Sequence, residues 1–453
     1  MKSTLKWIVI IITIIIFLYA FSSSYYSQNI DHLDYVIALG IDALPDSDNL
    51  SVTFEFANLG SFSENASSEQ TEPIINTIIA PTLSNAITVM NAYIGKQLNL
   101  SHCKVIVFSK DYAQTGILDE VSFLAHNIQI RPTTNIVVTE CDAVTYLKKS
   151  TSSLEQVLTK YYDIFPTSSE YTGYTSNIPL GRFYENLLDK NSGAVTILGS
   201  LVENATSINN SNKESSNNSN NQTNSSELNT SSTSSEENDI SSNKSNTTEI
   251  NKVIKDTQGN SSDYQSFDPT QIIQEGDKCV ENMGLTVFRN DKYVGNLSTI
   301  ETLCYSLLKD EVDNFVLTIP NPFDNTQKID IMVGDLSESK TNIDISKDFP
   351  VINIKFNLTA EVINVLNNSP QNYENTLKEI DIALKNYLTN EFKNYLYKTS
   401  KEYKSDINEF YRIAKRKFLT NSDYDNYNWS KKYENAEFNI EFNDNIISTL
   451  IIR

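Results

Sequence analysis

The strongest constraint on the fold is an amphipathic stretch near the C-terminus, residues 375–418, which contains neither Gly nor Pro. Its apolar side chains recur at intervals of three and four residues, at Leu377, Ile380, Leu384, Leu388, Phe392, Tyr395, Tyr403, Ile407, Phe410 and Ala414. This spacing places them on one face of an α-helix, and Lys, Glu, Asp and Asn fill the other face. We therefore expect one long helix, or two helices with a break near Ser405, packed on a core.

Residues 30–202 alternate between strand-like and helix-like segments. In one of the strands Val52, Phe54 and Phe56 alternate with polar residues, which predicts that this strand is half-buried. Strands that alternate with helices imply helices packed on a sheet, so we expect an α+β (mixed α/β) fold. The expected strands are 33–42, 50–57, 104–108, 135–139 and 194–202, and the expected helices are 81–98, 118–126 and 143–162.

The C-terminal half repeats this mixture. Two apolar runs, residues 284–288 and 293–297, flank the polar turn RNDK and predict a β-hairpin. A short helix is expected at 299–309, and further strands at 314–319, 328–333, 351–363, 437–443 and 446–452. We expect two to three domains, each a central β-sheet packed with helices.

The segment 203–263 differs from the rest because Ser, Asn, Thr and Glu dominate it. Such a segment buries too little apolar area to offset its ordering entropy, so we predict a disordered linker. It divides the chain into a segment 1–29, an N-terminal domain 30–202, the linker 203–263, a middle domain 264–349 and a C-terminal domain 350–453.

Residues 1–21 begin with Lys2 and Lys6 and continue as an apolar run broken only by Thr13. A basic start before an apolar run is typical of a signal peptide or a signal anchor. Cleavage after Ala20 would place Leu18 where a small residue is expected, so we favour an uncleaved transmembrane anchor. The lysines predict a cytoplasmic N-terminus, with the bulk of the chain on the outer side of a membrane.

Composition excludes several function classes. The chain carries 57 acidic and 36 basic residues, a net charge of −21, and nucleic-acid binding needs a cationic face instead. The Cys residues (103, 141, 279 and 304) form no C-x-x-C pair, so a zinc site is not expected. His102 precedes Cys103 directly, and neighbours on a strand point to opposite faces, so they would not form a catalytic dyad.

No nucleotide-binding, metalloprotease or serine-hydrolase motif occurs in the sequence. We therefore predict no catalytic residues, no cofactor and no metal site. A secreted hydrolase is the least favoured class, because no arrangement of nucleophile and base supports it.

The order and spacing of several segments resemble the C subunit of spore nutrient germinant receptors, the GerC family of endospore-forming bacteria. The resemblance covers nearly all of the chain outside the low-complexity segment. Its matching segments are LDYVIALGID (33–42), LSNAITVMNAYIGKQL (83–98), residues 100–138, GLTVFRNDKYVGNLSTIETL (284–303), EYKSDINEFYRIAKRKF (402–418), Trp429 and the closing strands.

The resemblance implies a non-catalytic subunit on the outer face of the spore inner membrane. It would work with a membrane-embedded A subunit and a transporter-like B subunit in nutrient-triggered germination. It also implies three α/β-type domains, and His102 and Asp406 match positions that recur in the family, for which we expect structural roles. Which nutrient is sensed, and whether this subunit contacts it, stays open.

One departure concerns lipidation. Family members typically carry a lipid-modified Cys before a Trp-Asp-Arg-type segment, and alignment on LGID places Ser24 where that Cys would lie and Tyr25 where the Trp would lie. Thioether lipidation needs a thiol, so we expect the N-terminal apolar segment to provide the membrane attachment instead. The alternative function, from another class, is a stand-alone membrane-anchored extracytoplasmic binding protein or adhesin.

Overall fold

The computed structural model describes residues 2–21, 32–57, 74–150, 158–202, 279–364 and 373–447. Ser24, the low-complexity segment 203–263 and the last expected strand beyond residue 447 lie outside these ranges. Helix α1 (Lys2–Phe21) contains the N-terminal apolar run. Among the described residues, no helix meets the length and apolarity needed to cross a membrane, so the predicted transmembrane anchor finds no support there.

The first sheet has ten strands, with β10-β9-β7-β6-β5-β1-β2-β3 as its main order. Four neighbouring strands, β7, β6, β5 and β1, run parallel, and the strands on both sides of them pair antiparallel. The strands are β1 (Leu33–Leu44), β2 (Ser47–Phe56), β3 (Ile74–Ala80), β4 (Gln97–Asn99), β5 (Val105–Ser109), β6 (Asn135–Thr139), β7 (Ala194–Leu201), β8 (Val280–Glu281), β9 (Leu285–Arg289) and β10 (Lys292–Leu297).

Helices cover both faces of this sheet. The side chain of Thr82 accepts a hydrogen bond from the amide of Asn85 and so caps α2, which begins at Leu83, two residues after the expected start at Pro81. The helices are α2 (Leu83–Ile94), α3 (Lys110–Thr115), α4 (Leu118–His126), α5 (Ala143–Lys149), α6 (Leu158–Ile164), the 3₁₀ turn Phe165–Ser168, α7 (Ser169–Thr172) and α8 (Leu180–Leu188).

The predicted half-buried state of β2 is wrong. Thr53 and Glu55, on the side expected to face solvent, are as buried as Val52 and Phe54. The reason is a second apolar layer that includes Tyr146 of α5 and residues of α6, and it packs on that side of the sheet. An alternating pattern therefore occurs here in a strand that is covered on both faces.

The second sheet has the order β11-β12-β13-β14, with two antiparallel pairs and a final parallel one. Its strands are β11 (Phe315–Asn321), β12 (Asp324–Asp344), β13 (Val351–Asn364) and β14 (Glu437–Ile447). Because β12 and β13 pair with each other, one sheet contains residues from both sides of the expected boundary at residue 350. Likewise, the hairpin β9–β10 extends the first sheet, although it follows the low-complexity segment in sequence.

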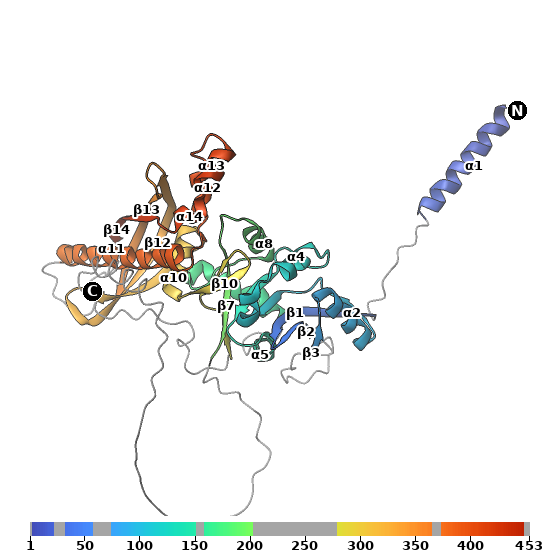
Figure 1. Cartoon of the computed structure of the whole chain (residues 1–453), viewed down its shortest axis with the longest axis horizontal. Coiled ribbons are helices and arrows are strands. Elements are labelled where there is room, and N and C mark those ends of the chain that lie inside the picture. Colours follow the sequence, from blue (N-terminus) through green and yellow to red (C-terminus); the bar gives the residue numbers. More distant parts are fainter. Residues whose placement is uncertain are drawn as a thin grey trace, which may run out of the picture.

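The amphipathic stretch forms two helices with a break between them, which is one of the two predicted alternatives. Helix α11 (Tyr373–Tyr397) lies along the second sheet, where the ring of Phe392 packs on Phe356 and Phe442 (Figure 1). A π-helical turn (Lys398–Glu402) and an irregular segment around Ser405 then interrupt the repeat. The remaining helices are α10 (Thr299–Leu308), α12 (Phe410–Lys415), α13 (Asn421–Tyr427) and α14 (Trp429–Tyr433).

Candidate functional site: a polar junction between the two sheets

The break in the helical repeat lies against the first sheet. Tyr403 donates a hydrogen bond of 2.7 Å from its hydroxyl to the carbonyl oxygen of Asn296 in β10. Ser405 donates one of 2.7 Å from Oγ to the carbonyl oxygen of Phe288 in β9. The segment that ends the long helix of the second sheet is therefore fastened to the hairpin of the first sheet.

Two glycines leave room for this segment. The amide of Gly193 donates a hydrogen bond of 3.0 Å to the carbonyl oxygen of Asp406. A Cβ atom at Gly193 would lie 1.9 Å from Oγ of Ser405, and one at Gly295 would lie 2.4 Å from the ring of Tyr403. A side chain at either glycine would therefore force the segment away from the sheet.

Asp406 is buried at the centre of this contact between the two sheets. Its carboxylate accepts hydrogen bonds from the amides of Phe410 (3.1 Å) and Tyr411 (2.8 Å), the first two residues of α12, and from Nε1 of Trp429 (2.9 Å). Burial raises the pKa of Asp406 to about 7, although these hydrogen bonds favour the charged form. The Asp406 carboxylate thus caps α12 and also positions Trp429, the first residue of α14.

A charge cluster borders Asp406. Oε2 of Glu409 lies 3.4 Å from Nζ of Lys309, which follows α10, and 3.3 Å from Nε of Arg412. Burial lowers the pKa of Lys309, and its carboxylate neighbours oppose that shift. Glu409 has a φ of 60°, a left-handed conformation that is uncommon outside glycine, so the surrounding contacts hold its backbone there.

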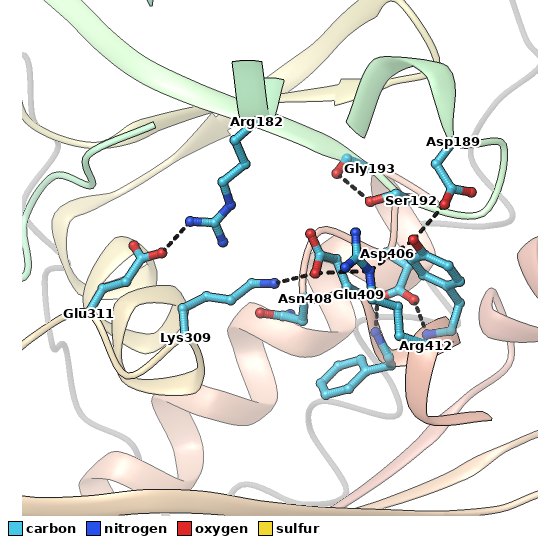
Figure 2. A network of polar contacts seen from close by, with 12 residues as sticks. Arg182, Asp189, Ser192, Gly193, Lys309, Glu311, Asp406, Asn408, Glu409 and Arg412 are labelled. Atoms are coloured by element: carbon cyan, nitrogen blue, oxygen red, sulfur yellow. Dashed lines mark hydrogen bonds and ion pairs between the residues drawn. The ribbon is translucent and has the colours of Figure 1, made fainter. Parts of the chain in front are cut away.

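Helix α8 provides the partners from the first half of the chain (Figure 2). Arg182 forms an ion pair of 2.7 Å with Glu311, which also accepts a short hydrogen bond from Ser176. Next to α8, Asp189 accepts a hydrogen bond of 2.5 Å from the hydroxyl of Tyr411. Residues in and after α8, residues that follow α10, and the segment from Tyr403 through α12 therefore meet in one polar network, which we call the junction.

The chemistry of the junction is that of a connector. Its charged side chains are paired with one another: Arg182 with Glu311, and Glu409 with both Lys309 and Arg412. In the part of the chain that the structure describes, no group of three His, Cys, Asp or Glu side chains could hold a metal ion. Of these ion pairs, Arg182–Glu311 connects the two halves of the chain, and Lys309–Glu409, which is largely buried, connects the residue after α10 to the residue before α12.

A second buried polar cluster lies between the first sheet and the helices α5 and α6 that cover it. Glu55 accepts a hydrogen bond of 2.9 Å from the hydroxyl of Tyr162, and burial raises the pKa of Glu55 to about 8. Nearby, Tyr146 donates to Oδ1 of Asn282 (2.6 Å), whose amide nitrogen donates to the hydroxyl of Tyr161 (3.1 Å). This cluster joins α5 and α6 to the sheet. Reasoning from the sequence missed it, because the burial of Glu55 depends on which helices cover β2.

The residues singled out in the sequence do not form one site. Asp406 belongs to the junction, whereas the ring of His102 packs edge-on against Tyr35, with centroids 5.1 Å apart. Cys103 is buried, and burial raises the pKa of its thiol to about 12, which disfavours the thiolate form. All four cysteines are free, two of them buried and two partly exposed. The break in the repeat near Ser405 was the sequence signal for the junction.

Comparison with known proteins places the whole arrangement in a family. Residues 26–200 match the family model described as spore germination protein N-terminal domain, and residues 283–449 match the one described as spore germination B3/GerAC like, C-terminal. A solved structure titled "Crystal Structure of the GerBC protein" is similar at 14% identity, with a TM-score of 0.47, over 90% of this chain and 96% of that chain. No curated protein matched the chain.

The N-terminal model matches the first region and the C-terminal model the second, and together the two regions contain both sheets and the junction. The chain belongs to the GerC family of spore germinant receptor C subunits.

Proposed function

We propose that the chain acts as the non-catalytic C subunit of a spore germinant receptor, outside the inner membrane, together with A and B subunits in nutrient-triggered germination. The observation that carries the proposal is the match of both halves to spore germination models.

In this proposal the junction is the mechanical part of the subunit. A receptor subunit that passes a signal from one partner to another needs two bodies in a defined orientation. The paired charges around Glu409 and the buried hydrogen bonds of Asp406 supply that connection. Contacts with the A and B subunits would then use exposed faces of the two sheets and their helices.

Helix α1 offers the attachment to the membrane. Its exposed side chains include Trp7, Ile12 and Ile16, and a helix with apolar side chains on all sides favours a lipid environment. Fractionation of spores is the direct test. We expect the chain in the membrane fraction, and we expect Ile12→Lys combined with Ile15→Lys to shift it toward the soluble fraction.

The deciding experiment deletes the gene and follows loss of spore refractility after nutrient addition. We expect failure with one set of nutrients and a normal response to a non-nutrient trigger that acts downstream of the receptors. Complementation with the unaltered gene should restore the response. The Gly334→Ala form should restore it too, because a Cβ atom there has no neighbour closer than 3.7 Å.

Normal germination of the deletion strain with every nutrient, also after deletion of any paralogous gene, would overturn the proposal. The alternative function, a stand-alone membrane-anchored binding protein or adhesin, would then remain. Purification of the chain from spore membranes distinguishes the two directly, since only a receptor subunit is expected to retain two multi-spanning membrane proteins.

A further inference from the structure

Helices α12, α13 and α14 form a basic projection on an acidic molecule. Residues 410–433, which we call the basic tip, contain six basic and two acidic residues, whereas the whole chain has a net charge of −21. In Figure 1 the corner between α12 and α13 stands out from the C-terminal half of the molecule. A local cationic surface of this kind keeps its effect despite the overall charge, because salt screens exposed charges beyond about 8 Å at physiological ionic strength.

Some cations of the basic tip are engaged and others are available. Arg412 pairs with Glu409, and Lys417 donates a hydrogen bond of 2.9 Å to Oδ1 of Asn342. Lys415 and Arg416 are exposed, and neither forms an ion pair within the described ranges of the chain. These two side chains can therefore meet an anionic partner without breaking an internal ion pair.

Aromatic packing holds the basic tip in shape. The ring of Phe418 lies 5.6 Å from that of Tyr424 and 5.2 Å from that of Tyr427. Nζ of Lys415 lies 5.5 Å above the Tyr424 ring, and Nζ of Lys432 lies 4.6 Å above the Tyr427 ring. The cations on α12 and α14 thus flank one aromatic cluster and are presented on the same part of the molecule.

Leu419 occupies the corner between α12 and α13 and is 99% exposed. It follows directly after the basic run Lys415, Arg416 and Lys417. A protruding leucine beside cations can insert among lipid headgroups, where it needs no complementary pocket, whereas a protein partner would have to provide one. This combination favours a lipid surface over an acidic protein.

We propose that the basic tip docks on an anionic lipid surface, with Lys415 and Arg416 at the headgroup phosphates and Leu419 inserted between headgroups. Together with the apolar helix α1, this second contact would orient the body of the subunit on the membrane. Each basic residue near an anionic surface contributes about 1 kcal/mol, which corresponds to a roughly fivefold change in the binding constant.

The test uses the full chain mixed with lipid vesicles, with an environment-sensitive fluorophore attached at Leu419→Cys. The partly exposed Cys141 and Cys279 are replaced by Ser to prevent background labelling. Ile128→Cys provides the matched control, because Ile128 is 100% exposed in a loop of the first half. Neutral phosphatidylcholine vesicles are compared with vesicles that contain phosphatidylglycerol.

We expect a blue-shifted, brighter signal at position 419 only in the anionic vesicles, a loss of that signal at high salt, and no change at position 128. Lys415→Gln combined with Arg416→Gln should lower the binding constant for the anionic vesicles about 25-fold. Lys148→Gln with Lys149→Gln, the same change of charge at another exposed place, should leave it unchanged. Thermal melting of each form confirms that it is folded.

Three results would overturn the inference. The first is an equal signal at position 419 in neutral and anionic vesicles, and the second is an equal effect of the two double substitutions. The third is a signal that rises with protein concentration in the absence of vesicles, which would assign the basic tip to a second, acidic copy of the chain. None of these results bears on germination, so the proposed function stands or falls separately.

Discussion

The amide of Gly193 and the carbonyl oxygen of Asp406 are 3.0 Å apart, and this hydrogen bond joins residues more than two hundred positions apart in the sequence. Gly193 immediately precedes β7 of the first sheet, and Asp406 lies in the segment that follows the long helix of the second. The contact exists because position 193 has no side chain. Four expected outcomes follow from this junction and from the buried cluster around Glu55.

The first concerns the fit at Gly193. A Cβ atom there would meet Ser405 at 1.9 Å, so Gly193→Ala should lower the free energy of unfolding by about 1–3 kcal/mol and loosen the junction. Thermal unfolding and protease cleavage near residue 405 measure both effects. Gly334→Ala is the control, and we expect it to change stability by less than about 0.5 kcal/mol. Equal behaviour of the two variants would contradict the close fit.

The second concerns Asp406. Replacement by Ala leaves three buried donors, two amides and the indole of Trp429, without their acceptor. We expect a loss of at least about 3 kcal/mol in chemical unfolding, since each unsatisfied buried group costs about 1–3 kcal/mol. Trp429→Phe removes only one of the donors and should cost less. An Ala variant as stable as the Phe variant would show that the amides find other partners.

The third concerns the ion pair between Lys309 and Glu409, which is largely buried. A double-mutant cycle with Lys309→Met and Glu409→Gln should give a coupling energy of about 1–3 kcal/mol. The pair Lys355–Glu441, with both side chains 54% exposed, is the matched comparison and should give less than about 1 kcal/mol. Equal coupling energies for the two pairs would show that the buried pair does not stabilise the junction more than an exposed ion pair would.

The fourth concerns pH. The pKa of Glu55 rises from 4.5 to about 8 on folding because of burial, so between these pH values the native state binds more protons than the unfolded chain. Its contribution to stability is therefore complete below pH 4.5 and is lost as the pH rises through 8. A Gln side chain has no proton to lose at this position. In Glu55→Gln we therefore expect the unfolding free energy to decrease less between pH 4.5 and 8 than in the unaltered chain.

Denaturant titrations at several pH values measure this slope. Glu185→Gln, at an exposed position of α8, makes the same chemical change and should leave the slope as it is in the unaltered chain. This control separates the effect of Glu55 from the general repulsion within an acidic protein. The same slope of unfolding free energy against pH in the unaltered chain and in both variants would show that another group, and not Glu55, causes the pH dependence.

Local patterns predicted the well-bounded elements of the fold. The helix at 118–126 and the strand at 135–139 have the expected boundaries, because their apolar periodicity and their polar neighbours agree. The break near Ser405 was also expected, although as one of two alternatives. In these places the residues that decide the structure are neighbours in sequence.

The parts that the sequence alone did not reveal depend on contacts between distant residues. Strand β3 (Ile74–Ala80) and helix α8 were not predicted. The burial of Glu55 follows from the packing of α5 and α6 on a face that looked polar. The junction likewise depends on Gly193, Lys309 and Glu409 coming together, and no short motif marks such an encounter.

The place of the β9–β10 hairpin has a consequence for synthesis on the ribosome. Strand β7 leaves one edge unpaired until β9 arrives, and β9 is separated from it in sequence by residues 202–284. The nascent N-terminal half must therefore emerge with an open sheet edge, which is a template for pairing with other chains. A gene fragment that stops after β7 would carry the same liability, so the two halves are best regarded as one folding unit.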